Sequence, residues 1–409
     1  MVTKINYSNL ELMQARVSHV PDGWGLYSIE SVFAIKNNLR KPISEDERYK
    51  NPGEYPYYGP TKIQGYIGTY EQNGSYVLIG EDGDHFLKYD KQKMTQLVDG
   101  KCTVNNHAHI IAGTSKAIRE WFYYYFMHRD IFSFLSRQGA GRYKLNKASL
   151  QKIPLLVPPL SEQEKISQIL SSWEKAIYLT ENLLENSQLQ KKALMQKIFT
   201  GKARFPKFND EWKFKRINEI ATRIQRKSDG NTHPILTISS LSGFVRQDER
   251  YSRYMAGESV NNYILLNKNE FAYNKGNSKS YEFGCIFDLD NYDTGLVPHV
   301  YVCFKLKSGL SHRYFKYLFE ADYLKRQLGS IVNTGVRNNG LLNIKPSEFM
   351  MLKVPVPSFE EQEAIADALH ISSQTIKSLQ CKIALLKQEK KALMQQLLTG
   401  KRRVKVDAA

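Results

Sequence analysis

The 409-residue sequence contains no uninterrupted apolar stretch long enough to cross a bilayer, so no membrane-spanning helix is predicted. Its first twenty residues lack the apolar core and small-residue cleavage site of a secretory signal, and we therefore expect a cytoplasmic protein. Cysteine is also scarce: four residues are present without any C-x-x-C pair, which argues against a disulfide framework or a zinc knuckle. The class that remains is a globular protein with reduced thiols.

Acidic residues are too few to balance the basic ones. Asp and Glu number 41 against 58 Lys and Arg, which leaves a net charge of +17 and a pI near 9.4. A surplus of this size indicates an anionic partner, most economically nucleic acid, although charge alone leaves DNA, RNA and acidic membranes open. The apolar content of 42% is ordinary and excludes a disordered chain.

Recognisable catalytic and metal-binding motifs are missing. The Thr-Gly-Lys triplets at residues 200 and 399 lack the upstream glycine and the following Ser/Thr of a phosphate-binding loop. Residues 51–55 lack the second proline of an amino-methyltransferase loop, and the acidic residues at 80–85 lack the spacing of a calcium loop. We therefore predict no catalytic residue, no metal site and no cofactor bound to this chain.

The strongest positive feature is an internal repeat. KKALMQKIFTGKAR at residues 191–204 returns as KKALMQQLLTGKRR at residues 390–403, an offset of 199. The same offset relates Val157-Pro158 to Val356-Pro357 and Gln163-Glu164 to Gln362-Glu363, whereas Trp24 and Trp212 echo each other at an offset of 188. The chain is therefore predicted to be two similar modules, each a divergent region followed by a matching tail.

The matching tails are predicted to be long helices. Ser161-x-x-Glu164 and Ser358-x-x-Glu361 have the pattern of capping boxes, and Gly201 and Gly400 stand where left-handed C-terminal caps would close the helices. Between these ends, apolar residues follow a heptad seam with a lysine at the same place in both copies, residues 191 and 390. Two helices of about 39 residues and on the order of 58 Å, packed as an antiparallel coiled coil, are expected. The alternative is that each helix lies across its own domain.

The divergent regions, near residues 25–150 and 213–343, mix short strand-like runs with Gly, Asn and Asp turns. Each ends in an aromatic segment predicted as a helix, residues 115–134 and 311–328. The predicted fold class is mixed α/β: two globular domains, two long helices forming an antiparallel coiled coil, and an internal pseudo-twofold repeat. The predicted segments are recognition domain 1 (1–150), a central helical spacer (151–205), recognition domain 2 (206–343) and a C-terminal helical spacer (344–409).

Four loops of the divergent regions combine glycine with Arg, Lys, Asn and Gln. These side chains match the donor and acceptor patterns of base edges, and glycine admits backbone close to phosphate. Plain solvated turns and phosphate contacts are the alternatives for any single residue. The predicted DNA-binding residues are Lys62, Gln64, Tyr66, Arg137, Arg142, Lys144, Asn274, Lys275, Asn277, Lys279, Arg337 and Asn338.

Taken in order, these features resemble the specificity subunit of type I restriction-modification systems. The resemblance rests on six features that each occur twice: a Trp-led start, a variable basic region, a proline-rich exit, Glu-Gln-x-x-Ile, a long heptad helix, and Lys-Lys-Ala-Leu-Met-Gln followed by Thr-Gly-Lys. Gly-Glu-Asp-Gly at residues 80–83 and Asn-His-Ala-His at 106–109 are further family-like passages. The resemblance covers nearly the whole chain.

The resemblance implies two target recognition domains, each reading one half of an asymmetric, bipartite site in double-stranded DNA. It further implies that the helices set the spacing and dock two modification (methyltransferase) subunits, and that restriction subunits act as motor and nuclease. S-adenosylmethionine, ATP and Mg would then be used by these partner subunits, and this chain would have no catalytic residue and no membrane contact.

Two other functions remain open at this point. One is an enzyme with an unrecognised nuclease or methyltransferase site, which would act on DNA without partners. The other is a coiled-coil scaffold that binds nucleic acid or another protein without reading sequence.

Overall fold

The computed structural model describes residues 7–138, 142–251, 258–276, 278–332 and 342–406. By contact, the chain forms two compact units. Unit 1 joins the chain up to Glu181 with the segment from Lys382 onward, and unit 2 is Asn182–Cys381. Both long helices are divided between the units, so each unit contains the start of one helix and the end of the other. The four segments predicted from the sequence divide the chain by sequence module and not by contact, and their boundaries stay a prediction.

Unit 1 is an α/β domain built on a sheet. Its elements are α1 (Asn9–Gln14), β1 (Gly25–Ser28), α2 (Ile29–Val32), β2 (Ala34–Ile35), η1 (Asn37–Leu39), α3 (Glu45–Lys50), β3 (Pro52–Tyr58), β4 (Ile63–Ile67), β5 (Gln72–Gly80), η2 (Asp84–Lys88), β6 (Thr95–Val104), β7 (Ala108–Ala112), α4 (Arg119–Phe126), η3 (Phe132–Phe134), β8 (Ser136–Gln138), β9 (Arg142–Lys144), α5 (Lys147–Lys152), β10 (Pro154–Val157) and the first part of α6 (Leu160–Phe199).

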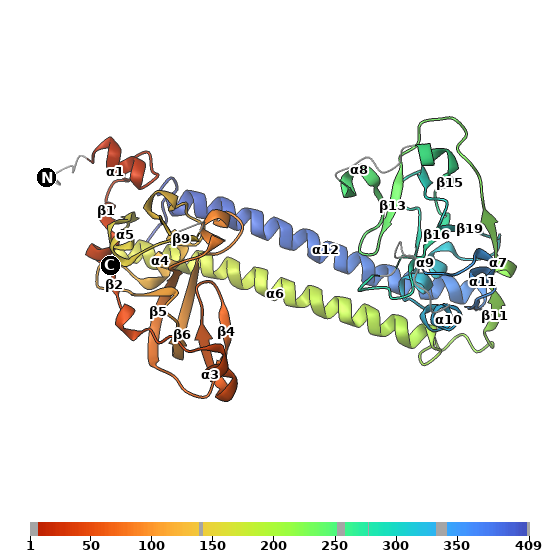
Figure 1. The fold of residues 1–409 in the computed structure, drawn as a ribbon, viewed down its shortest axis with the longest axis horizontal. Coiled ribbons are helices and arrows are strands. Elements are labelled where there is room, and N and C mark those ends of the chain that lie inside the picture. Colours follow the sequence, from red (N-terminus) through yellow and green to blue (C-terminus); the bar gives the residue numbers. More distant parts are fainter. Residues whose placement is uncertain (1–6, 139–141, 252–257, 277, 333–341, 407–409) are drawn as a thin grey trace. The chain divides into compact units, whose positions relative to one another are not determined.

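The six-stranded sheet of unit 1 has the order β2-β7-β5-β6-β3-β4, with β4 at one edge (Figure 1). Its neighbours pair antiparallel except β3 and β6, which are parallel. The aromatic helix α4 contributes Trp121 and Phe122 to the core, where both are fully buried. Strand β1 pairs with β10, so the Trp-led start meets the proline-rich exit of the same module.

Unit 2 repeats this plan with different strands. Its elements are the end of α6, β11 (Lys213–Arg216), α7 (Ile217–Ile220), β12 (Ala221–Ile224), β13 (Leu236–Ser239), β14 (Gly243–Arg246), α8 (Gln247–Arg250), η4 (Glu258–Asn262), β15 (Ile264–Asn267), β16 (Phe271–Asn274), β17 (Cys285–Asp288), β18 (Thr294–Val297), β19 (Val302–Leu306), α9 (His312–Glu320), α10 (Lys325–Ile331), α11 (Pro346–Met350), β20 (Lys353–Val356) and the first part of α12 (Phe359–Leu397).

The described strands of unit 2 form a four-stranded sheet, β12-β19-β16-β17, and three two-stranded pairs, β13-β14, β15-β18 and β11-β20. The β11-β20 pair corresponds to β1-β10 in unit 1, because both join the Trp-led start to the proline-rich exit. The middle of the module differs: six paired strands in one case, four plus short hairpins in the other. The matching ends and unlike middles confirm the repeat inferred from the sequence.

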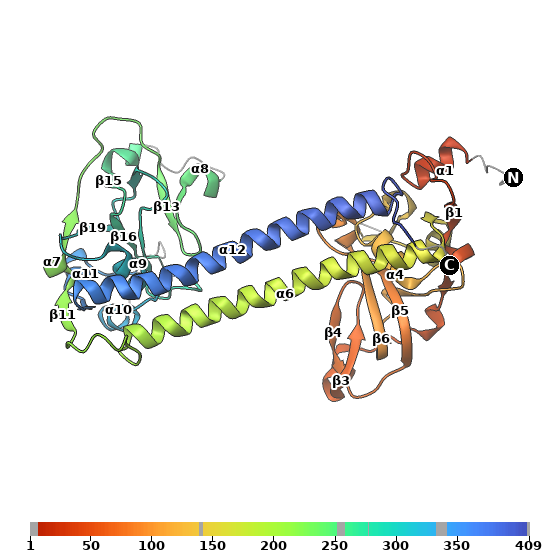
Figure 2. The same cartoon turned by 180° about the vertical axis from the view of Figure 1, so that it is seen from behind.

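The two long helices pack antiparallel within each unit (Figures 1 and 2). In unit 1, Ile166 near the start of α6 shares a core with Leu397 at the end of α12. In unit 2, Ile198 near the end of α6 shares a core with Ile365 near the start of α12. The predicted seam is buried at both ends, and the antiparallel pairing of the heptad helices is confirmed inside each unit.

Three local predictions need correction or adjustment. Helix α6 already begins at Leu160, so Ser161 lies inside the first turn and its predicted capping box with Glu164 is wrong. In the second copy only the serine half of the capping box is present: the Ser358 hydroxyl accepts the Glu361 amide hydrogen at 3.3 Å, while the Glu361 carboxylate binds Arg204 and Trp212. The helix predicted over residues 115–134 is shorter, because α4 ends at Phe126 and only the 3-10 turn η3 follows. Both glycine caps hold, with φ of 73° at residue 201 and 68° at residue 400.

Candidate nucleic-acid interface

Each module is closed by an ion-paired clamp that involves both copies of the repeat. In unit 2, the Arg204 guanidinium binds the Glu361 carboxylate at 3.0 and 2.8 Å, and Trp212 Nε1 donates to Glu361 Oε2 at 3.0 Å. In unit 1, Arg403 and Trp24 bind Glu162 in the same way, with Trp24 Nε1 3.3 Å from Glu162 Oε2. In each unit, an arginine just after the end of one long helix therefore binds a glutamate at the start of the other long helix.

A buried glutamine beside each clamp carboxylate fixes the helix to the aromatic helix of its module. Gln163 Oε1 accepts the Ile118 amide hydrogen at 3.0 Å, and Gln362 Oε1 accepts that of Ser311 at 2.9 Å. Both glutamines also donate to the carbonyl of a proline at the helix entry. The repeated Glu-Gln pair is thus a frame that positions a divergent domain on the helices.

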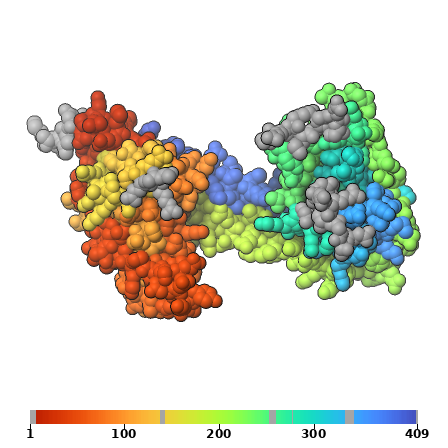
Figure 3. Space-filling model, in the orientation of Figure 1, coloured from red at the N-terminus to blue at the C-terminus, as the bar shows by residue number. Residues whose placement is uncertain are grey.

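Three predicted DNA-binding residues lie on the β3–β4 hairpin at the edge of the unit 1 sheet. Lys62 occupies the turn, Gln64 and Tyr66 follow in β4, and all three are exposed, Tyr66 by 56%. Gln64 Oε1 accepts a hydrogen bond from Asn105 Nδ2 at 3.0 Å, which holds that side chain in place. This hairpin belongs to the red-to-orange surface of unit 1 (Figure 3).

The β8–β9 hairpin carries the other three predicted residues of the first module. Arg137 is exposed, with its guanidinium carbon 5.7 Å from the centre of the Tyr143 ring. Arg142 opens strand β9, while Lys144 ends it and places Nζ 3.3 Å from Glu81 Oε1. Arg137 is therefore available at the surface, whereas Lys144 forms an ion pair with Glu81.

Glu81, directly after β5, joins these elements. Its half-buried carboxylate accepts hydrogen bonds from Arg40 and pairs with Lys144, and its backbone carbonyl accepts the Leu145 amide hydrogen at 2.7 Å. Burial raises the pKa of the Glu81 carboxyl, but the Arg40 hydrogen bond and the nearby cations outweigh burial and hold that pKa below its ordinary value. Glu81 therefore stays ionised and fixes the end of the β8–β9 hairpin.

Behind this carboxylate, His109 is a neutral part of the core. His109 Nε2 lies 2.7 Å from the Leu145 carbonyl oxygen and must donate to it, so Nδ1 accepts from Asn37 Nδ2 at 2.8 Å. Burial lowers the pKa of the imidazole, with only partial compensation from Leu145 and Glu81. His109 thus supports the hairpin without adding charge.

Replacing Glu81 with glutamine is expected to loosen the β8–β9 hairpin. Glutamine cannot compensate the charges of Arg40 and Lys144, so a loss of about 1–3 kcal/mol in local opening free energy follows. Amide exchange at residues 136–138 and 142–144 should accelerate about tenfold or more, measured by mass spectrometry. Asp82→Asn is the matched control, because the Asp82 carboxylate pairs with the exposed His107; equal effects of both changes would contradict this role of Glu81.

In unit 2, the predicted residues follow strand β16. Asn274 Oδ1 accepts the Gly276 amide hydrogen at 3.0 Å and shapes the turn, while the Lys275 carbonyl accepts the Leu342 amide hydrogen at 3.1 Å. Lys279 is exposed. The predicted residues Asn277, Arg337 and Asn338 lie outside the described residues. The structure therefore assigns Asn274 a turn-forming contact, and its predicted base contact stays a prediction.

One aromatic and basic surface was not predicted from the sequence. Lys101 on β6 places Nζ 4.8 Å from the ring centre of Tyr70 and 5.7 Å from that of Tyr55 on β3. The two rings lie 5.0 Å apart, and Tyr70 is 42% exposed. Cation–π and stacking surfaces of this kind bind nucleic acid bases. The density of tyrosines between residues 55 and 70 was the available signal, but the parallel pairing of β3 with β6 was not predictable.

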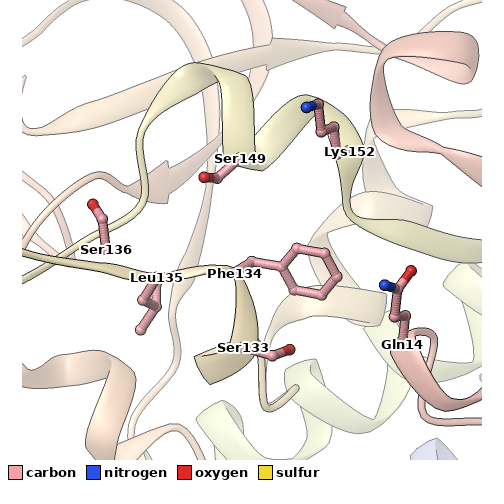
Figure 4. A pocket seen from close by; sticks show the side chains of 7 residues that line it. All are labelled: Gln14, Ser133, Phe134, Leu135, Ser136, Ser149 and Lys152. Atoms are coloured by element: carbon pink, nitrogen blue, oxygen red, sulfur yellow. The ribbon is translucent and has the colours of Figure 1, made fainter.

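The pocket drawn in Figure 4 has a volume of about 350 Å³ and lies between α1, the η3–β8 segment and α5 of unit 1. Among the described residues that line it, Lys152 is ionisable and the others are Gln14, Ser133, Phe134, Leu135, Ser136 and Ser149. Within the described residues, no group of three or more His, Cys, Asp or Glu could hold a metal ion. The same residues contain no helix long and apolar enough to cross a membrane.

Three of the four cysteines, Cys102, Cys285 and Cys303, are buried thiols, as expected, whereas Cys381 is exposed on α12. Burial raises the pKa of Cys102 to about 11 and that of Cys285 to about 12. These thiols therefore stay protonated and pack as small apolar side chains.

A duplicated α/β module with exposed basic and aromatic hairpins defines a class, the bipartite nucleic-acid-recognition proteins. Comparison with protein families narrows it: the model of the type I restriction modification DNA specificity domain matches residues 21–187 and again residues 209–388. Each match covers one divergent region with most of the helix that follows. The chain belongs to the family of type I restriction-modification DNA specificity proteins.

Similar proteins carry the same description. A putative type I restriction enzyme specificity subunit of Haemophilus influenzae is 39% identical over 144 residues, which are 35% of this chain and 36% of that subunit. The type I restriction enzyme MjaVIII specificity subunit of Methanocaldococcus jannaschii is 23% identical over 417 residues and 94% of both chains.

Solved structures agree on the fold. The S subunit of a type I restriction-modification system from M. genitalium superposes with a TM-score of 0.60 at 13% identity, over 93% of this chain and 97% of that one. A chain from a study of complex assembly and conformational transition in a type I system gives a TM-score of 0.51 at 14% identity, over 94% of this chain and all of the other. At these identities the likeness concerns the fold alone.

Proposed function

We propose that this chain is the sequence-specific DNA-recognition subunit of a type I restriction-modification complex, and that each unit reads one half of an asymmetric, split target. The observation that carries the proposal is the pair of matched clamps around unlike domains: Glu162 with Arg403, and Glu361 with Arg204. The same set of contacts occurs in both units and holds two recognition domains with different sheets. Two unlike readers in one chain predict two unlike half-sites, whereas a homodimer would require a palindrome.

The exposed hairpins supply the DNA contacts. Lys62, Tyr66 and Arg137 in unit 1 and Lys279 in unit 2 are exposed and combine positive charge with an aromatic face. In this proposal they bind base edges or phosphates, while Lys144, which pairs with Glu81, orients the hairpin that carries Arg137.

Catalysis belongs to partner subunits in this proposal. The chain supplies no catalytic residue, binds two modification subunits along its helices, and assembles further with restriction subunits. S-adenosylmethionine serves the modification subunits, and ATP with Mg serves the restriction subunits. The chain itself recognises double-stranded DNA and holds the two half-sites at a fixed separation.

Mapping modified bases in cells tests this function. The chain co-expressed with its modification subunit is expected to place N6-methyladenine at one bipartite motif with two different halves and a constant gap. The chain expressed alone is expected neither to methylate nor to cleave DNA. DNA modification by the chain alone would establish the enzyme alternative, and equal affinity of the assembled complex for every duplex would establish the scaffold alternative.

Replacing Lys62 with alanine is expected to weaken DNA binding by the assembled complex in a salt-dependent way. Loss of one phosphate contact makes the negative slope of log K against log salt concentration shallower by about 0.9. Binding isotherms at several salt concentrations measure this slope. Lys387→Ala is the matched control, because this exposed lysine pairs with Glu181 on the helices; an unchanged slope for Lys62→Ala would place Lys62 outside the DNA contact.

A further inference from the structure

Each helix carries one buried lysine at the same place in the repeat. Lys191 is 9% exposed in unit 2, and Lys390 is 8% exposed in unit 1. A buried ammonium group is stable only beside a carboxylate, because its desolvation is otherwise uncompensated. The two units provide this carboxylate from different elements.

In unit 1, the acid comes from the long helix. Lys390 Nζ lies 2.8 Å from Glu174 Oε1 on α6, 5.9 Å from the centre of the Tyr124 ring, and 3.9 Å from Met127 Sδ. Glu174 also accepts a hydrogen bond from Lys93 at 2.6 Å. Burial lowers the pKa of Lys390, and the Glu174 hydrogen bond offsets this only in part.

In unit 2, the acid comes from the recognition domain. Lys191 Nζ lies 2.5 Å from Glu320 Oε1 at the end of α9 and 5.1 Å from the centre of the Tyr317 ring. On α12, His370 Nδ1 lies 3.4 Å from the Tyr317 hydroxyl. Ser373, on the same helix, donates its hydroxyl hydrogen to a backbone carbonyl one turn earlier at 2.8 Å. No carboxylate of α12 stands where Glu174 stands in unit 1.

The positions of unit 1 and unit 2 that correspond to each other are identified from the sequence repeat in the helices and from shared contacts in the domains. On the helices, the offset of 199 relates Glu174 to Ser373. In the domains, the frame glutamines bind the amides of residues 118 and 311, which gives an offset of 193. That offset relates the two tyrosines beside the lysines, 124 and 317, and it places Met127 opposite Glu320.

We propose that the position of this acid is a compatibility key between a recognition domain and the helices that hold it. The unit 1 helices supply the acid themselves, as Glu174, and are therefore compatible with a domain that has an apolar residue at the Met127 position. The unit 2 helices have serine there and require a domain that brings the acid of Glu320. A domain moved from unit 1 to unit 2 therefore leaves Lys191 unpaired, and the reverse move places a second carboxylate beside Glu174.

The key limits which domain exchanges yield new DNA specificities, and it concerns assembly of the chain, not base reading. It goes beyond the proposed function, because its tests involve folding without DNA. Their failure would leave the recognition function standing, and failure of DNA recognition would leave the key standing.

Moving the acid tests the key in the full-length chain. Glu320→Met is expected to accelerate amide exchange in α9 by about tenfold or more, because Lys191 loses its partner. Adding Ser373→Glu should restore protection by supplying the acid from the helix, as in unit 1. Glu282→Met is the matched control, because Glu282 forms an exposed pair with Lys325. Exchange in α9 that matches this control, or no rescue by the second change, would overturn the proposal.

If Glu320→Met prevents folding of unit 2, a double variant still tests whether Glu320 acts through Lys191. Lys191→Met combined with Glu320→Met removes both charges and should restore the protein, since an apolar side chain in place of the buried lysine needs no carboxylate partner. Failure of this double variant to restore soluble protein would show that Glu320 acts through something other than the lysine.

A domain duplication gives an independent readout. In a chain that carries residues 25–150 in both recognition positions, soluble yield should depend on residue 127 of the second copy. Met127→Glu in that copy is expected to raise the yield of folded chain several-fold over the unmodified copy. Equal yields would contradict the key.

Discussion

Replacing Glu361 with glutamine is expected to lower the free energy of unfolding of unit 2 by about 3 kcal/mol. The carboxylate is 2% exposed and receives hydrogen bonds from both nitrogens of the Arg204 fork and from Trp212. Glutamine keeps the size but cannot balance the arginine charge in this buried setting. Urea unfolding followed by amide exchange, resolved by segment, measures the change.

Glu363→Gln is the control on the same helix. Glu363 pairs with Arg313 at a site where both side chains are more than a third exposed, and such pairs contribute about 0–1 kcal/mol. The larger effect should also be confined to residues of unit 2. Equal destabilisation by both variants would show that the clamp carboxylate adds nothing beyond an ordinary surface pair.

Removing residues 391–409 is expected to unfold unit 1 and to leave unit 2 protected. The segment contributes Met394, Leu397 and Leu398 to the unit 1 core and Arg403 to its clamp. Truncation of each large buried side chain costs about 2–5 kcal/mol, so the total exceeds the usual stability of a domain. Amide exchange is the measurement, with the loss expected between residues 21 and 181.

A point variant refines the same prediction. Leu397→Ala should lower the stability of unit 1 by about 3 kcal/mol, because Leu397 is 3% exposed. Leu385→Ala on the same helix should have little effect, because Leu385 is 59% exposed. Loss of protection in unit 2 instead of unit 1 would contradict the exchange of helix ends between the modules.

The sequence predicted the repeat and the helices because their signals are local or periodic. A heptad seam and closely similar tails can be read along the chain, and the seam is buried at its two ends, one in each unit. The first capping box was misplaced because a proline, Pro159, occupies the position that serine 358 occupies in the second copy. The clamp of Arg403 with Glu162 joins residues 241 apart, and no local pattern predicts such a pairing.

The recognition surface was predictable only in part. Glycine-flanked basic loops identified Lys62 and Arg137, which are exposed. Whether a lysine is available or paired depends on distant residues, as Lys144 with Glu81 shows. The surface of Lys101 between two tyrosines likewise required the strand order of the sheet.

The acid that accompanies each buried lysine illustrates the same limit. Glu174 and Glu320 are unrelated in the sequence repeat, and both resemble ordinary surface glutamates there. Only the contacts with Lys390 and Lys191 show that they perform one task from two elements.

The most direct test of the whole account is an exchange of residues 213–343 for the corresponding region of another specificity subunit that carries an acid at the Glu320 position. N6-methyladenine is then mapped in cells that also express the modification subunit. One half of the bipartite motif is predicted to change, with the other half and the gap retained. A change in both halves, or in neither, would contradict the assignment of one half-site to each unit.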